Sequence, residues 1–183
     1  MKGTVVLLGS PRRAGNSETL AEAVLHGAGE RAGEIFRHRL SDMPISGCLD
    51  CRRCWSNEKP CVLNDAMSDI YESMRKSDLI LFVSPLYWYI WSGQIKPALD
   101  RFLPFAAEKP LFDLRGKKAI LVATAGDTDP ACFDGLRFSF RTSCKLLGLE
   151  NHAEILAHGI YLRGEIDGTD WLDQAKVIGK ALP

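Results

Sequence analysis

Short apolar runs alternate along the chain with longer segments whose apolar residues recur at helical spacing. The first run, Thr-Val-Val-Leu-Leu at 4–8, stops at Gly-Ser-Pro, which is typical of a buried parallel strand. In the next segment, 17–31, Leu20 and Val24 lie on one helical face, and Ser17 is a suitable N-cap. The same alternation continues along the chain. It predicts strands at 4–8, 34–40, 78–83, 118–125 and 152–160, and helices at 17–31, 65–74, 92–103, 131–147 and 169–182.

The alternation of buried strands with amphipathic helices predicts an α/β fold, in which helices cover both faces of a parallel sheet. In such a doubly wound, three-layer fold the ligand crevice lies at the carboxyl ends of the strands. No internal repeat or linker interrupts the pattern, so we interpret residues 1–183 as a single domain. The segment 41–64 has neither the helical nor the strand spacing of apolar residues, and it exceeds the ~12–15 residues of an ordinary loop. We expect this insertion loop to have a function.

Composition narrows the classes of function. The 23 Lys and Arg residues balance 23 Asp and Glu residues, and a net charge of zero argues against a nucleic-acid coat protein or a polybasic membrane binder. No apolar stretch approaches the ~18 residues of a membrane-spanning helix. No signal-peptide cleavage site follows the N-terminus. We therefore expect a cytoplasmic protein that binds no nucleic acid and no membrane.

The loop between the first strand and the first helix, 9–17, suits an anion. The helix N-terminus provides free N–H groups, and Ser10, Asn16 and Ser17 add short hydrogen-bonding side chains. Arg12 and Arg13 add positive charge, so a phosphate monoester would be well held. The loop matches neither the triphosphate-binding nor the dinucleotide-binding glycine pattern. The alternative is a capped loop with two solvated arginines.

Two further loops follow predicted strands and would lie at the same edge of the sheet. The loop 84–93 places four aromatic residues between positions 87 and 91. Tyr and Trp side chains in this number favour either a flat conjugated ligand or a dimer interface. The loop 123–128 has small residues that let the backbone approach a ligand edge.

Four of the six cysteines fall within the insertion loop, with the spacing Cys48-x2-Cys51-x2-Cys54-x6-Cys61. Three thiolates at this spacing are typical of ferredoxin-type [4Fe–4S] ligation. Structural zinc sites favour two separated pairs instead, which this is not. Zinc and free thiols remain the alternatives. Cys132 and Cys144 are isolated, and we interpret them as buried apolar residues.

The segments GSPRRAGNS at 9–17, SPLYWYIWSGQIKPALDR at 84–101 and ATAGD at 123–127 together resemble the flavodoxin-like NAD(P)H-dependent FMN reductase family. The resemblance implies a five-stranded parallel sheet of order 2-1-3-4-5 with FMN at the switch point, in homodimers or homotetramers. The cysteine spacing resembles the iron–sulfur flavoprotein branch. The implied contacts are Ser10, Arg12, Asn16 and Ser17 on the FMN phosphate; Pro85, Leu86, Tyr87 and Trp88 along the isoalloxazine ring; Thr124, Ala125 and Gly126 over its other edge; and Cys48, Cys51, Cys54 and Cys61 on a [4Fe–4S] cluster.

The resemblance implies an enzyme in which FMN takes hydride from NADH or NADPH and passes electrons to a quinone, another flavin, a metal ion or an organic electrophile. No side chain is assigned as acid or base, because the cofactor carries the chemistry. One alternative is an electron-transfer module that exchanges electrons with a ferredoxin and binds no nicotinamide. Another is a flavin-binding or sensing protein without turnover.

Overall fold

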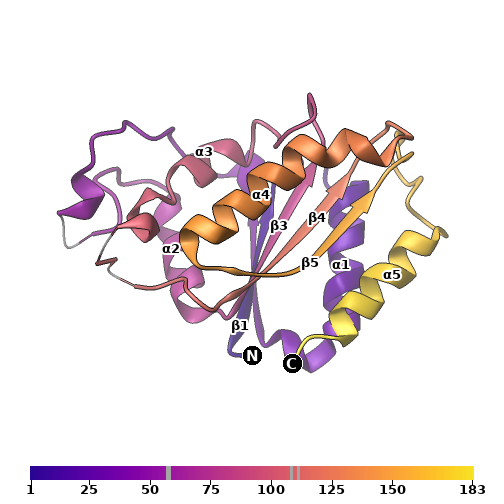
Figure 1. Ribbon diagram of the computed structural model, residues 1–183, viewed down its shortest axis with the longest axis horizontal. Helices are drawn as coiled ribbons and strands as arrows, with labels where there is room; N and C mark the ends of the chain where they lie inside the picture. Colours follow the sequence, from indigo (N-terminus) through magenta and orange to yellow (C-terminus); the bar gives the residue numbers. More distant parts are fainter. Residues whose placement is uncertain (57–58, 108, 111) are drawn as a thin grey trace.

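A sheet of five parallel strands runs through the middle of the molecule, with helices on both faces (Figure 1). The computed structural model describes residues 1–56, 59–107, 109–110 and 112–183. The strands pair in the order β2-β1-β3-β4-β5, which confirms the expected flavodoxin-like order 2-1-3-4-5. They are β1 (Gly3–Leu8), β2 (Glu34–Arg39), β3 (Leu79–Pro85), β4 (Lys118–Thr124) and β5 (Glu150–Ala157).

The central strands are apolar because helices cover both of their faces. Every residue of β1 is buried, and in β3 and β4 only Pro85 and Lys118 are partly exposed. The edge strand β2 has the mixed sequence Glu-Ile-Phe-Arg-His-Arg, and none of its residues is fully buried. The contrast between continuous apolar runs and a mixed run therefore marks the middle and the edge of the sheet.

Alternate residues of β1 enter two separate cores. Val6 and Leu8 pack against α1 (Asn16–Ala28) and α5 (Asp170–Lys180) on one face of the sheet. Val5 and Leu7 point to the other face, as the period of two along a strand requires. There the covering helices are α2 (Met67–Lys76), α3 (Lys96–Asp100) and α4 (Asp134–Leu147). Within the described ranges, no helix combines the length and the apolar character that a membrane crossing requires.

Short 3-10 helices join these elements, and some of them replace parts of predicted α-helices. Pro130 starts a 3-10 turn, so α4 begins at Asp134 and not at 131. The predicted helix 92–103 is α-helical only from Lys96 to Asp100, with Pro97 in its first turn, and Leu103 already belongs to a 3-10 helix. The 3-10 helices are η1 (Gly29–Ala32), η2 (Leu40–Asp42), η3 (Arg53–Trp55), η4 (Leu103–Ala106) and η5 (Pro130–Phe133).

The start of α1 and the end of β5 also differ from the prediction. α1 begins at Asn16 with Gly15 as its N-cap, so Ser17 is buried inside the first turn and does not cap the helix. β5 ends at Ala157, three residues before the predicted end, because the chain turns at Gly159 with a φ of 69°. A φ in this region favours glycine, which has no Cβ.

The insertion loop lies at one end of the molecule, beside α2 and α3 (Figure 1). Among its described residues, 41–56 and 59–64, the structure contains no strand and no α-helix. The indole Nε1 of Trp55, in η3, donates to the carbonyl of Leu103 at 3.0 Å. This bond ties the loop to η4.

Two glycines allow α1 and α5 to pack with their backbones in contact. A Cβ at Gly27 would lie 2.1 Å from the carbonyl oxygen of Lys176, and one at Gly179 would lie 2.0 Å from that of Val24. No side chain fits at either distance, so this helix pair requires glycine at both positions.

We predict that Gly179→Ala lowers the free energy of unfolding by about 1–3 kcal/mol, since backbone atoms must move apart to admit the methyl group. Urea denaturation measures the change. Gly47→Ala is the matched control, because a Cβ there meets nothing within 4 Å, and its effect should stay within about 0.5 kcal/mol. Equal stability of the two variants would contradict the close helix contact.

Candidate functional site

A cleft of about 230 Å³ opens at the carboxyl ends of the strands, between the loops after β1, β3, β4 and β5. This is the crevice position expected for a doubly wound sheet. All but one of the predicted cofactor-binding residues lie in the wall of this cleft. Those that line the cleft are Ser10, Arg12, Asn16, Ser17, Pro85, Leu86, Tyr87, Thr124, Ala125 and Gly126.

The N-terminus of α1 forms the polar end of this cleft. Its N-cap residue, Gly15, provides no side-chain cap, so the N–H groups of the first turn are available to an anion. Ser10 and Ser17 are almost fully buried beside it. Ser10 also shapes the loop, because its hydroxyl accepts the amide of Arg12 at 3.2 Å. A phosphate group fits this set of donors.

The two arginines of the loop have different surroundings. Arg13 donates to the carboxylate of Asp42 in an ion pair. Arg12 lines the cleft and forms no ion pair with any residue that the structure describes. Of the two arginines, Arg12 is therefore the one whose charge is left free at the cleft.

Asn16 lies in the cleft wall, but its side chain has other partners. Its amide nitrogen donates to the carbonyl of Leu162 at 2.7 Å, and its amide oxygen accepts the N–H of Gly164 at 2.9 Å. These bonds hold the loop after β5 against the start of α1. Any contact of Asn16 with a phosphate would therefore come from its backbone N–H.

Buried hydrogen bonds fix the loops relative to one another. The hydroxyl of Ser92 donates to the carbonyl of Gly9 at 2.6 Å, which joins the loop after β3 to the loop after β1. Leu86 donates its amide to the carbonyl of Thr124 at 2.8 Å. Glycine is required at position 9, because a Cβ there would lie 2.9 Å from the Ser92 hydroxyl. The cleft walls are thus held in place by the polypeptide alone.

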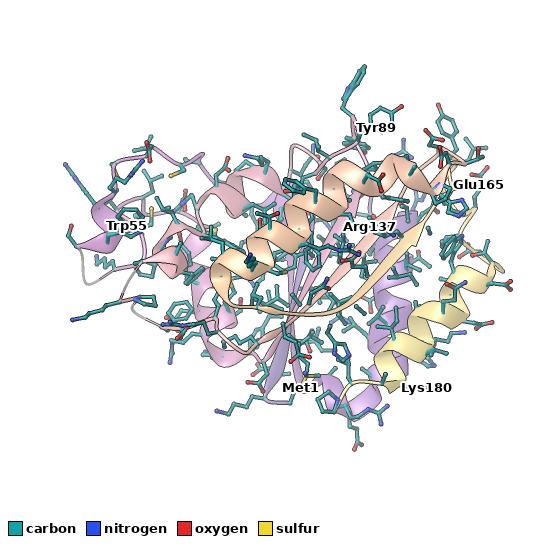
Figure 2. The ribbon with its side chains drawn as sticks, viewed as in Figure 1. Met1, Trp55, Tyr89, Arg137, Glu165 and Lys180 are labelled. Carbon is teal, nitrogen blue, oxygen red and sulfur yellow. The ribbon has the colours of Figure 1, made fainter. Side chains whose placement is uncertain are left out.

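The aromatic loop folds as a tight hairpin whose tip points outward. Tyr87 and Ile90 exchange two backbone hydrogen bonds of 3.2 Å, and Trp88 and Tyr89 between them have φ angles of 49° and 64°. Trp88 is 91% exposed and does not line the cleft, so the structure does not place it with the other residues expected along the isoalloxazine ring. Tyr89 projects from the same tip (Figure 2). Trp91 is buried and donates to the hydroxyl of Ser139 at 2.9 Å.

The sequence reasoning did not identify Ile160 and Tyr161, which complete the cleft wall from the loop after β5. Tyr161 packs on Gly126, where a Cβ would lie 2.5 Å from its ring. The available signal was topological, because the last strand of a parallel sheet ends at the same edge as the others.

The four clustered cysteines line a second cavity, at the end of the molecule where Trp55 is labelled (Figure 2). Cys48 and Cys51 are exposed, while Cys54 and Cys61 are half-buried. Burial raises the pKa of the Cys54 thiol, and the negative charges of the other three thiolates raise it further. All four thiols thus share one cavity, in which two of them are partly shielded from solvent.

The backbone of the cysteine loop donates a hydrogen bond to one sulfur atom and turns sharply between the cysteines. The amide of Asp50 donates to Sγ of Cys48 at 3.4 Å, and Asp50 and Arg52 have left-handed φ angles of 47° and 59°. In the described part of the chain, no three His, Cys, Asp or Glu side chains are already arranged around one metal ion. A cuboidal cluster needs a wider arrangement of thiolates, because each one binds a different iron. The four thiols of this cavity are donors of the kind that such a cluster takes.

The sheet order defines a flavodoxin-like fold, and the cleft opens at the free N-terminus of a helix. A family model described as NADPH-dependent FMN reductase matches residues 3–131. The chain belongs to this family, which confirms the family predicted from the sequence.

Similar proteins include iron–sulfur flavoproteins. One from Archaeoglobus fulgidus is 29% identical over 122 residues, a match that covers 67% of this chain and 55% of the relative. Another from Methanosarcina thermophila is 31% identical over 118 residues, covering 64% of this chain and 60% of the relative. The matched region thus spans little more than half the length of these curated relatives.

Solved structures share the fold along the whole chain. An NAD(P)H:quinone oxidoreductase from Methanothermobacter marburgensis has a TM-score of 0.72 at 19% identity, with 98% of this chain and 96% of that chain covered. An FMN-dependent NADH-azoreductase from Bacillus anthracis, in complex with FMN, has a TM-score of 0.69 at 16% identity, with 100% and 98% covered.

Proposed function

We propose that this chain is an FMN-dependent oxidoreductase that takes hydride from NADH or NADPH and passes electrons to a small acceptor. A quinone, another flavin, a metal ion or an organic electrophile is the class of acceptor we expect. The observation that carries the proposal is that one cleft at the switch point joins a free helix N-terminus to the loops after β3 and β4. Family membership supports the same chemistry.

The cleft offers each part of FMN a suitable surface. The N–H groups that begin α1, the hydroxyls of Ser10 and Ser17, and Arg12 would hold the phosphate. Leu86 and Tyr87 would contact the isoalloxazine ring from the β3 loop, and the loop 124–126 would approach its other edge. FMN, when bound, supplies hydride acceptance and electron transfer, while the protein orients it and excludes water.

We also propose that Cys48, Cys51, Cys54 and Cys61 hold a [4Fe–4S] cluster. Their shared cavity, the N–H bond to Cys48 and the iron–sulfur relatives support this assignment. An oxygen-sensitive cluster suits the reducing cytoplasm, where we place the protein. The exposed hairpin tip with Trp88 and Tyr89 is the surface through which we expect a homodimer or homotetramer to form.

A second candidate function is electron transfer with a ferredoxin and without nicotinamide. The exposure of Cys48 and Cys51 favours it, because a cluster held there would lie close to a docked one-electron partner.

We predict that anaerobic protein loaded with FMN is reduced by NADPH or NADH, seen as loss of flavin absorbance near ~450 nm in stopped-flow experiments. Reduced ferredoxin is tested in parallel. Rapid reduction by ferredoxin, with no oxidation of either nicotinamide, would select the electron-transfer function instead. Protein that takes up no added FMN would refute both.

Arg12→Ala should weaken FMN binding about 10-fold or more, because a charge-assisted bond to the phosphate contributes about 1.5–3 kcal/mol. Titration of the apoprotein with FMN, followed by flavin fluorescence, gives the dissociation constant. Arg13→Ala is the neighbouring control, since Arg13 is engaged with Asp42. Equal losses in the two variants would count against Arg12 as the phosphate contact.

Cys51→Ala should remove iron and acid-labile sulfide while FMN stays bound, because the cysteine cavity and the flavin cleft share no lining residue. Metal and sulfide analysis of anaerobically purified protein provides the measurement. Cys144→Ala is the control, as Cys144 is buried elsewhere in the core. Unchanged iron in Cys51→Ala would argue against the ligand set.

A further inference from the structure

Arg101 is a charged side chain in the interior of the protein. It follows α3 directly, and only 1% of its side chain is exposed. Burial by itself lowers the pKa of Arg101, but the hydrogen bond to Asp65 and the nearby Cys61 raise it above its ordinary value. The guanidinium therefore stays charged. A buried charge of this kind is unfavourable unless its donors have partners.

The ion pair with Asp65 uses a single nitrogen of this guanidinium. Nη1 donates to both carboxylate oxygens of Asp65, at 2.7 Å and 2.5 Å, and to the carbonyl of Ser46 at 3.4 Å. Nε and Nη2 are buried and have no partner among the residues that the structure describes. One edge of Arg101 is thus left with two parallel N–H groups.

The same edge is fully used by other arginines of this chain. Arg37 donates through Nε and Nη2 to Glu22 at 2.8 Å and 2.9 Å. Arg141 does so to Glu154 at 2.7 Å and 3.0 Å. This fork is the usual way in which arginine binds an anion. Arg101 keeps it free even though it is far more buried than the other two.

Arg101 lines the cavity of the four cysteines. Tyr71 lines it too, but its hydroxyl donates to the carbonyl of Arg101 at 2.7 Å, and burial raises its pKa. Arg52 is the other cation in the lining; it is 60% exposed and pairs with Asp50 at 3.0 Å. Among the described residues of the cavity wall, Arg101 is therefore the buried cation with free donors.

We propose that the Nε–Nη2 edge of Arg101 donates hydrogen bonds to the sulfur atoms of the iron–sulfur group held by Cys48, Cys51, Cys54 and Cys61, and so makes that group easier to reduce. The inference rests on the cluster part of the proposed function. One-electron reduction adds a negative charge and no proton, and a cation in a buried site stabilises that charge strongly. Hydrogen bonds to the sulfurs are a known determinant of cluster potential.

The alternative is that Arg101 only anchors the loop through Asp65. The two roles predict different shifts of the reduction potential when Arg101 and Asp65 are substituted in turn. Arg101→Gln removes a positive charge beside the cluster, whereas Asp65→Asn removes the negative charge that offsets it. An anchoring role predicts the same disturbance from both variants, because either one breaks the ion pair.

The test is an anaerobic titration with dithionite and redox mediators, in which the spectrum of the cluster gives its midpoint potential. We expect Arg101→Gln to reduce the equilibrium constant for one-electron reduction at least tenfold, a fall of about 59 mV. Asp65→Asn should shift the potential upward. Arg101→Lys should lower the potential less than Arg101→Gln does, because lysine keeps the positive charge. Arg52→Gln is the matched control in the same cavity wall. Because the charge that it removes is exposed to solvent, the equilibrium constant for reduction should change less than threefold.

Each outcome decides the inference. It is overturned if Arg101→Gln shifts the potential no more than Arg52→Gln, or if Arg101→Gln and Asp65→Asn shift it in the same direction. Should Arg101→Gln fail to fold, as judged by loss of bound FMN, the opposite shifts of Arg101→Lys and Asp65→Asn decide the question. If the protein without substitutions binds no iron or sulfide after reconstitution, the cluster assignment and this inference are refuted together. If that protein still binds FMN, the flavin part of the proposed function stands.

Discussion

The parallel pairing of β1 with β2 on one side and β3 on the other is the constraint on which the functional site depends. Because all strands run the same way, the loops that follow them meet at one edge of the sheet. The chain turns in opposite directions on the two sides of β1, which leaves a crevice there. The short bond from Ser92 to the carbonyl of Gly9 then locks the two loops across that crevice. The residues proposed to hold the phosphate and the ring are adjacent for this reason, although they are far apart in the sequence.

The segment 84–101 links the two candidate centres. Its first part, with Leu86 and Tyr87, forms a wall of the flavin cleft, and its last residue, Arg101, lies in the wall of the cysteine cavity. α3 lies between them. Asp65 and Trp55 anchor the cysteine loop to the same region, through Arg101 and through the carbonyl of Leu103.

The hairpin after β3 holds conformational strain at the rim of the cleft. Trp88 and Tyr89 both occupy the left-handed region, which is unfavourable for residues with a Cβ and is found most often where function requires it. The strain places large aromatic side chains in solvent next to the cleft, where a second molecule can cover them. Buried aromatic residues such as Trp91 hold the base of the hairpin, so the tip keeps its shape.

The sequence alone determined the order of elements, the strand order through the family resemblance, and nearly all of the cleft residues, because apolar runs and loop chemistry are local properties. It also identified the four cysteines by their spacing. Only the tertiary structure decided that Trp88 points away from the cleft, that the side chain of Asn16 serves the loop after β5, and that Tyr161 completes the wall. It alone placed Arg101 beside the cysteines with two free donors. These facts depend on contacts between residues distant in sequence, and the pattern along the chain does not encode the direction in which a side chain points.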